Sequence, residues 1–332
     1  MGENIITVKD LKKTYRINKR SNGLFGHIAN LFVSKYEQKK AVDGISFDIK
    51  RGEVVGFIGA NGAGKSTTIK ILTGILYPDS GYVEVNNYIP YKDRKAYVAN
   101  IGVVFGQKSQ LSWDLPVIDT FELLKNIYKI PENVYEENVK LYTELLDMGS
   151  FINQPVRQLS LGQRMRADIA ASLLHSPQII FFDEPTIGLD VLAKEKIRDF
   201  IRYLKREKNI TMIFTTHDMQ DIEQTCERLI VIDKGKKMYD GRVSDLLKKY
   251  GGSKTIIVEF GELIDTEFAF DHVTVKKEDK SNQIIFEFDS SKVDVDDIMR
   301  QILQYKVNDI SVKESDVESI VRKIYEGSIV LE

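Results

Sequence analysis

A glycine-rich segment carries the first residues whose types and spacing could do chemistry. Gly59, Gly64, Lys65 and Ser66 follow the full P-loop pattern Gly-x-x-x-x-Gly-Lys-Ser. Glycines let the backbone fold tightly, so that several N–H groups can point at one phosphate chain. The lysine would place a positive charge on the β- and γ-phosphates, and the serine hydroxyl could ligate Mg²⁺. The predicted triphosphate-binding residues are Gly59, Ala60, Asn61, Gly62, Ala63, Gly64, Lys65, Ser66 and Thr67.

Two adjacent carboxylates, Asp183 and Glu184, form a second candidate group. They end the apolar run 179–182 and precede Pro185. We expect Asp183 to hold the hydration shell of Mg²⁺ and Glu184 to orient or deprotonate an attacking water. An Asp-Glu pair is common by chance, so its weight comes from its position at the end of a buried strand, far along the chain from the P-loop.

The elements that position these residues can be read from hydrophobic periodicity. The run 53–58 is almost continuously apolar, which indicates a strand buried on both faces, and it leads directly into the glycine loop. Residues 66–76 then show helical spacing. Three further apolar runs alternate with helix-like segments, at 179–182, 192–206, 210–215, 218–226 and 229–232. Strand, helix, strand in series predicts a parallel sheet with crossover helices.

Composition limits the function classes. The 332 residues have a formal net charge of −2, but residues 253–332 hold 10 Lys/Arg against 18 Asp/Glu, which indicates two units with different surfaces. In residues 1–252, Lys and Arg outnumber Asp and Glu only slightly for a segment of that length, so the charge does not indicate nucleic-acid binding. The single cysteine, Cys226, excludes a disulfide framework within the chain and fits a reducing cytosol. No apolar run approaches the roughly 18 residues that span a bilayer, and Met1 to Asp10 lacks the apolar region of a secretory signal.

Two segments stand outside the strand–helix series. Residues 16–40 are interpreted as a basic insertion, with apolar residues at helical spacing between Leu24 and Lys35. The run 250–253, Tyr-Gly-Gly-Ser, is typical of a linker. Beyond it the pattern predicts a small, acidic α+β domain over 253–332. Its expected strands lie near 255–260, 272–276, 283–288 and 308–312, and its expected helices at 294–305 and 315–326.

The order of the motifs resembles the ATP-binding-cassette ATPases over roughly residues 1–245. Besides the P-loop and the Asp-Glu pair, Leu159-Ser160-Leu161-Gly162-Gln163 resembles their signature motif, although the usual third residue is glycine. Whatever the family, Ser160 would cap the helix expected at 161–175. The resemblance implies an α/β fold: a P-loop NTPase cassette over 1–250 with a mixed-sheet core and a helical subdomain at about 107–165, followed by the small domain.

The resemblance also implies roles for single residues. The implied catalytic set is Lys65, Gln107, Glu184 and His217. The implied metal ligands are Ser66, Gln107 and Asp183. Gln107 would reach Mg²⁺ and the water, and His217 would hold the γ-phosphate. Tyr15 occupies the position where the family stacks an aromatic ring on adenine, and Tyr36 is the alternative ring.

A partner subunit follows from the same resemblance. In the family the signature of one subunit closes on the P-loop ATP of another, so a head-to-tail dimer holds two ATP molecules. The helix N-terminus behind Ser160 suits contact with a γ-phosphate. Gly188-Leu189-Asp190 resembles the D-loop, which contacts the opposite subunit. The residues implied at the second subunit's ATP are Ser160, Gly162, Gln163 and Asp190.

A transport role is implied by elimination within the family. Chromosome-maintenance and break-repair types carry a long coiled coil between P-loop and signature, and excision-repair types carry zinc cysteines; this sequence has neither. Segments 105–111, 113–116 and 185–190 resemble the ABC-2 exporter ATPases. The alternative is a soluble ATPase with a translation-linked or regulatory role.

The transport reading implies cofactors and partners. ATP and Mg²⁺ are the expected cofactors, a second copy of the chain is the expected dimer partner, and separate integral membrane permease subunits would hold the chain at the cytoplasmic face of the cell membrane. The insertion at 16–40 would lie either against lipid headgroups or a permease loop, or on the cassette's own sheet. The transported molecule is not encoded here.

Overall fold

The computed structural model describes residues 3–18, 36–264, 268–277, 281–290, 292–314 and 316–327. The chain divides into two compact units, Met1–Asp240 and Gly241–Glu332. The helical pattern noted between Leu24 and Lys35 lies outside the described residues. In the part of the chain that is described, no helix is long and apolar enough to cross a membrane.

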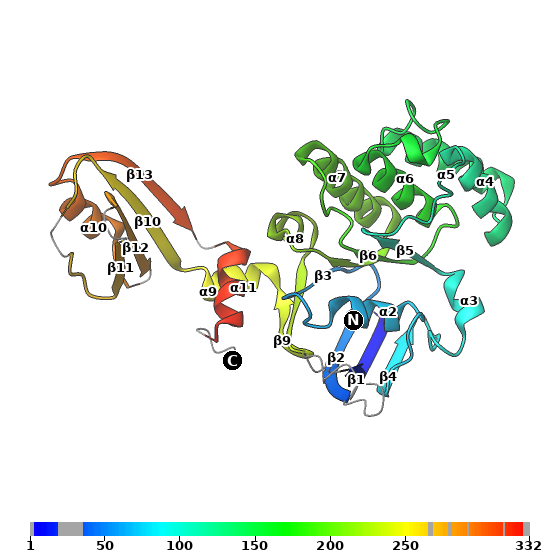
Figure 1. Ribbon diagram of the computed structural model, residues 1–332, viewed down its shortest axis with the longest axis horizontal. Coiled ribbons are helices and arrows are strands. Elements are labelled where there is room, and N and C mark those ends of the chain that lie inside the picture. Colours follow the sequence, from blue (N-terminus) through cyan, green and yellow to red (C-terminus); the bar gives the residue numbers. More distant parts are fainter. Residues whose placement is uncertain are drawn as a thin grey trace, which may run out of the picture. The chain divides into compact units, whose positions relative to one another are not determined.

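The first unit is built on a six-stranded sheet with the order β5-β6-β7-β3-β8-β9 (Figure 1). The strands are β3 (Val54–Gly59), β5 (Ile101–Phe105), β6 (Ile179–Asp183), β7 (Thr211–Thr215), β8 (Arg228–Asp233) and β9 (Lys236–Arg242). The pairs β5/β6, β6/β7, β7/β3 and β3/β8 are parallel, which confirms the expected parallel sheet. Every residue of β3 and β7 is buried, as is typical of parallel strands that are covered on both faces of their sheet.

A second, antiparallel sheet packs beside the first, with the order β2-β1-β4. Its strands are β1 (Asn4–Asn18), β2 (Tyr36–Lys50) and β4 (Ser80–Val85). The ends of the expected insertion, 16–18 and 36–40, belong to β1 and β2, and Tyr15 pairs with Lys39. The insertion is therefore narrower than 16–40, because the strand ladder continues to Asn18 opposite Tyr36 and satisfies the backbone groups. The core that these strands share with β3 and α2 includes Ile6, Phe47, Phe57 and Ile69.

Helices connect the parallel strands and form a separate group between β5 and β6. The helices of this unit are α2 (Lys65–Leu72), α3 (Arg94–Val98), α4 (Val117–Tyr128), α5 (Glu132–Leu145), α6 (Leu161–Leu173), α7 (Val191–Lys208) and α8 (Met219–Thr225). Pro131 is the residue directly before α5, and it separates this helix from α4. α4 and α5 both contact α6, so the signature segment at the start of α6 belongs to the inserted helical group.

The second unit is α+β, as expected. It contains α9 (Val243–Tyr250), β10 (Ser253–Phe260), β11 (Val273–Lys277), β12 (Gln283–Asp289), α10 (Val295–Ile302), β13 (Val307–Glu314) and α11 (Val317–Tyr325). The strands form an antiparallel sheet ordered β11-β12-β10-β13 around a core that includes Val258, Phe286 and Ile298. The unit begins before residue 253, because α9 lies against α11.

Candidate functional site

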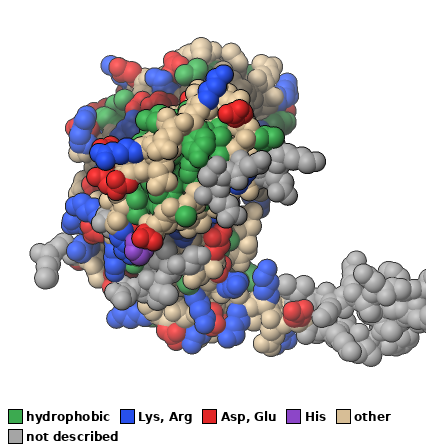
Figure 2. Space-filling model, turned by 90° about the vertical axis from the view of Figure 1, so that its left-hand side faces the viewer, with side chains coloured by type: hydrophobic (Ala, Val, Ile, Leu, Met, Phe, Trp, Pro, Cys, Tyr) green, Lys and Arg blue, Asp and Glu red, His purple; other side chains and the backbone are tan. Residues whose placement is uncertain are grey.

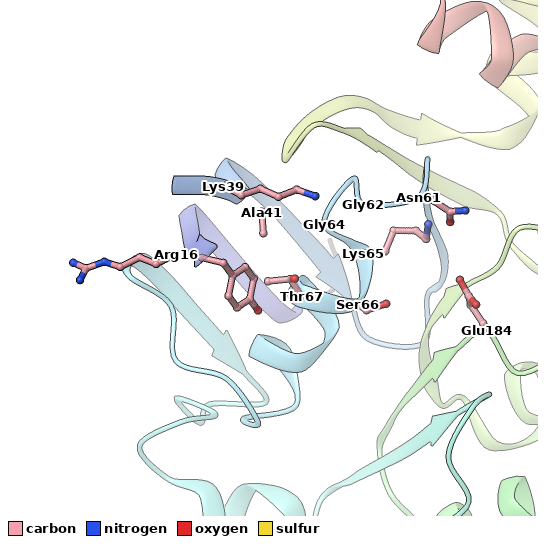
Figure 3. Close-up of a pocket in the computed structure, with 11 residues that line it drawn as sticks. Arg16, Lys39, Ala41, Asn61, Gly62, Gly64, Lys65, Ser66, Thr67 and Glu184 are labelled. Atoms are coloured by element: carbon pink, nitrogen blue, oxygen red, sulfur yellow. The ribbon is translucent and has the colours of Figure 1, made fainter. Parts of the chain in front are cut away.

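The P-loop connects the buried end of β3 to the first turn of α2. Gly64 has φ +113°, and a Cβ there would lie 2.3 Å from the carbonyl oxygen of Ala41, so only glycine fits. The loop lines a cavity of about 670 Å³ (Figure 3). Its described lining residues are Tyr15, Arg16, Lys39, Ala41, Asn61, Gly62, Gly64, Lys65, Ser66, Thr67 and Glu184. The structure thus brings the predicted P-loop, the aromatic Tyr15 and the predicted base into one cavity.

Lys65 is a buried cation at the base of this cavity. Its side chain is only 6% exposed, and its Nζ donates hydrogen bonds to the carbonyl oxygens of Gly59 (2.6 Å) and Ala60 (3.4 Å). Burial lowers the pKa of Lys65, while the negative charges of Glu184 and Asp183 act in the opposite direction. A buried ammonium held by carbonyls alone is suited to binding an anion such as a phosphate.

Asp183 gathers hydroxyl groups at the carboxyl end of β6. Thr215 Oγ1 donates to Asp183 Oδ1 at 2.8 Å, and Ser66 Oγ lies 3.5 Å from the same oxygen. Carboxylate and hydroxyl oxygens are the ligands that Mg²⁺ prefers, so this donor set fits the predicted metal. Sequence reasoning missed Thr215; the available signal was its place at the end of the strand that pairs with β6.

Glu184 and His217 are in direct contact. His217 Nε2 lies 2.6 Å from Glu184 Oε1. The backbone of Glu184 has φ +57°, a left-handed conformation that costs free energy in a non-glycine residue. Its N–H donates to the carbonyl oxygen of Thr215 at 3.0 Å and to the Oγ1 at 3.1 Å, which holds the turn in place. The two predicted catalytic residues therefore lie together on adjacent loops.

The loop after β5 approaches the same turn. A Cβ on Gly106 would lie 2.0 Å from the carbonyl oxygen of Glu184, so glycine is required for this approach. Gln107 follows and is exposed. Further along, Gln110 donates its backbone N–H to Asp168 Oδ1 at 2.9 Å and its side-chain amide to the Asp168 carbonyl at 2.9 Å. The segment after β5 is thereby tied to α6, the helix that begins at the signature.

A buried ionic network fixes the loops that carry Glu184 and His217. Arg198 Nε donates to Asp221 Oδ1 at 2.6 Å, and these residues are 4% and 0% exposed. Asp221 Oδ2 accepts from Thr186 Oγ1 at 2.5 Å and from Thr216 Oγ1 at 3.1 Å. Thr216 directly precedes His217 in the sequence, and Thr186 follows Glu184 and Pro185. Nothing in the local sequence marks Asp221, because its partners come from α7 and two loops.

The signature residues lie at the start of α6 and outside the described lining of the P-loop cavity. Ser160 Oγ accepts from the Gln163 N–H at 3.2 Å, and Gln163 Oε1 accepts from the Ser160 N–H at 2.9 Å, a complete capping box. A Cβ on Gly162 would lie 3.1 Å from that of Ala193 on α7. Asp190 caps α7 by accepting from the Ala193 N–H at 2.8 Å, and it too is absent from the described cavity lining.

Comparison with known proteins agrees with this geometry. Residues 42–187 match the family model described as ABC transporter. The chain is 33% identical over 215 residues to the ABC transporter ATP-binding protein NatA of Bacillus subtilis, covering 65% of this chain and 87% of that protein. It is 34% identical over 214 residues to the Nod factor export ATP-binding protein I of Ralstonia nicotianae, covering 64% and 66%.

A solved structure shares the fold. The dimeric post-hydrolysis state of an ATP-binding cassette bound to ADP and Pi is 27% identical, with a TM-score of 0.59, over 71% of this chain and 98% of that one. The chain belongs to the family of ABC transporter ATP-binding proteins and is an ATP hydrolase of that family.

Proposed function

We propose that this chain is the motor subunit of a transporter and works as a head-to-tail dimer that holds two ATP molecules. The observation that carries the proposal is the division of the motifs. The P-loop, Asp183, Glu184 and His217 converge on one cavity, whereas the signature at Ser160 is preorganised by its capping box away from that cavity. The chain therefore holds most of one site and the completing piece of another.

Exposed apolar residues beside Asp190 support a subunit contact at this point. Val191 and Leu192 are 74% and 80% exposed at the start of α7. Figure 2 shows hydrophobic side chains gathered on one face of the molecule. Exposed apolar surface is favourable to bury against a partner. The similarity to a dimeric cassette is a second support.

The chemistry assigned to the site is water attack on the γ-phosphate. Glu184 would accept the proton of the water, while Lys65 and His217 hold the phosphate oxygens and Gln107 orients the water. Ser66, Asp183 and Gln107 would hold Mg²⁺, which neutralises phosphate charge when bound. The direct contact between Glu184 and His217 supports this proposal, because a base and a phosphate anchor would have to lie close to the same γ-phosphate.

Substitution of Glu184 tests the proposal. Glu184→Gln keeps the shape but removes the base, so we expect steady-state hydrolysis to fall by about 10²–10⁴-fold, with an ATP-bound dimer accumulating on gel filtration. Lys65→Ala should lose hydrolysis without accumulating a dimer, because it weakens ATP binding itself. Glu207→Gln, an exposed change at the end of α7, is the matched control. Near-normal ATP turnover in Glu184→Gln would contradict the assignment of Glu184 as the base.

Export through separate permease subunits is the second part of the proposal. The relative from Ralstonia nicotianae is named for Nod factor export, and segments 105–111, 113–116 and 185–190 resemble the ABC-2 exporter ATPases. We assign the 107–158 region to contact with the permease, at the cytoplasmic face of the membrane. Its attachment to α6 through Gln110 and Asp168 would couple the permease to the signature. Purification from native membrane tests this, because an exporter subunit should bring an integral membrane protein with it.

A further inference from the structure

We propose that Lys39 is a second phosphate-binding lysine, which contacts the α- and β-phosphates of the nucleotide from the side of the P-loop opposite the Mg²⁺ ligands. The inference rests on the nucleotide site proposed above. It names a residue that lies outside the P-loop, signature and carboxylate motifs. On the sequence Lys39 belonged to a basic segment considered for membrane contact.

The register of the β1–β2 ribbon places Lys39 on the cavity side. Tyr15 and Lys39 are direct partners in the antiparallel pair, and directly opposite residues share one face of a sheet. Ala41 lies at the irregularity where the register shifts between Lys13 and Thr14, so its place at the cavity comes from the cavity lining and not from alternation along β2. Tyr15, Lys39 and Ala41 all line the cavity with the P-loop.

The Lys39 side chain is directed at the glycine loop. Figure 3 shows its ammonium pointing toward Gly62, whereas Arg16 extends away from the loop. A Cβ built on Gly62 would lie 3.7 Å from Lys39 Nζ. The ammonium is therefore within reach of an anion held by the amides of this loop.

Lys39 differs from the neighbouring lysines because, in the described part of the chain, no carboxylate pairs with its ammonium. Lys13 pairs with Asp79 at 2.7 Å, and Lys40 pairs with Asp43 at 3.3 Å. Within the described residues the Lys39 ammonium forms no ion pair or hydrogen bond, whereas Asp79 and Asp43 are acidic partners of the other two lysines. An exposed cation beside an anion-binding loop, with its charge uncompensated, is a phosphate ligand by its chemistry.

The position of Lys39 along the cavity indicates which phosphates of the nucleotide it would contact. The amides of a P-loop cradle the α- and β-phosphates, while its lysine reaches the β- and γ-phosphates. Lys39 lies beside Gly62 and across the ribbon from Tyr15, the ring expected on adenine. Glu184, the proposed base for the γ-phosphate, lies in Figure 3 on the other side of the P-loop from Lys39. Lys39 should therefore act equally on ATP and ADP, which share the two inner phosphates.

Nucleotide titration of the full-length chain tests the inference. Binding of ADP and of a non-hydrolysable ATP analogue is measured by calorimetry for wild type, Lys39→Gln, Lys39→Arg and Lys40→Gln. A charge-assisted contact at an exposed site should change affinity by about tenfold. We expect Lys39→Gln to weaken both nucleotides by the same factor of about 10, Lys39→Arg to restore most of it, and Lys40→Gln to match wild type.

The outcomes separate this inference from the proposed function. Failure of the wild-type chain to bind either nucleotide would contradict the nucleotide site itself. Wild-type binding with equal affinities for Lys39→Gln and Lys40→Gln would overturn the role of Lys39 alone. A loss confined to the ATP analogue would also overturn it, because the contact would then lie at the γ-phosphate. Lys39 is exposed, so a thermal melt that matches wild type shows that the fold is intact.

Discussion

The buried pair of Arg198 and Asp221 is expected to be the most sensitive structural point near the site. Asp221→Asn keeps the volume and leaves one oxygen to accept from Thr186 or Thr216. It removes the charge that compensates the Arg198 guanidinium, which is 4% exposed and donates to Asp221 at 2.6 Å. The second carboxylate near Arg198, that of Asp218, lies at 3.6 Å and already pairs with Lys194 at 2.6 Å. Asp218 would therefore compensate the charge of Arg198 only weakly in the Asp221→Asn variant.

The magnitude follows from that burial. Removing one partner of a buried ion pair costs about 3–5 kcal/mol, because the other charge is left uncompensated. With a urea dependence of about 2–3 kcal/mol per molar for a large domain, the unfolding midpoint should fall by about 1–2 M. The exposed pair of Asp199 and Arg202 on α7 offers a matched control. Asp199→Asn should change the free energy of unfolding by less than about 1 kcal/mol.

The assay is urea unfolding of the full chain, followed by the fluorescence of Trp113 and by far-UV circular dichroism. Trp113 is the single tryptophan and lies in the first unit, so its signal reports that unit alone. ATP hydrolysis of Asp221→Asn, measured in buffer where it remains folded, should also fall, because Thr216 precedes His217. A midpoint for Asp221→Asn equal to that of Asp199→Asn would refute the reasoning.

Two further titratable groups give predictions. Burial disfavours the charged form of Asp168 and raises the pKa of its carboxyl to about 6. The neutral carboxyl therefore contributes fully to stability below about pH 4, and this contribution is lost as the pH rises through about 6. Asp168→Asn should therefore exceed wild type in free energy of unfolding by up to about 3 kcal/mol near pH 8, and the gap should shrink toward pH 5; urea melts with a constant gap would contradict this. Burial also raises the pKa of Cys226 to about 12, so a thiol reagent near pH 8 should react only after denaturant is added, and rapid reaction of the native chain would exclude a buried thiol.

Much of the fold was readable in the sequence because it depends on local patterns. Continuous apolar runs predicted β3, β6, β7 and β8. The edges were less predictable. The ends of β1 and β2 fell within the segment interpreted as an insertion, because residues such as Tyr15 and Lys39 pair with each other across a long separation in sequence.

The candidate site also contains residues that local sequence patterns predict and residues that only the fold brings together. Local sequence patterns predicted the P-loop, the Asp183-Glu184 pair and the helix cap at Ser160, because each is formed by a few consecutive residues. His217 was placed by its order in the chain, and the structure brings it within 2.6 Å of Glu184.

Only the tertiary structure decided which distant residues support that chemistry. Thr215 reaches Asp183 because parallel strands end at the same edge of the sheet. Asp221 meets Arg198 through the packing of α8 on α7, and Lys39 faces the P-loop through strand register. Each contact depends on long-range pairing, and a shift of one residue in register would turn a side chain to the opposite face. The chain's composition and motifs therefore determine the chemistry, and the sheet determines which further side chains share in it.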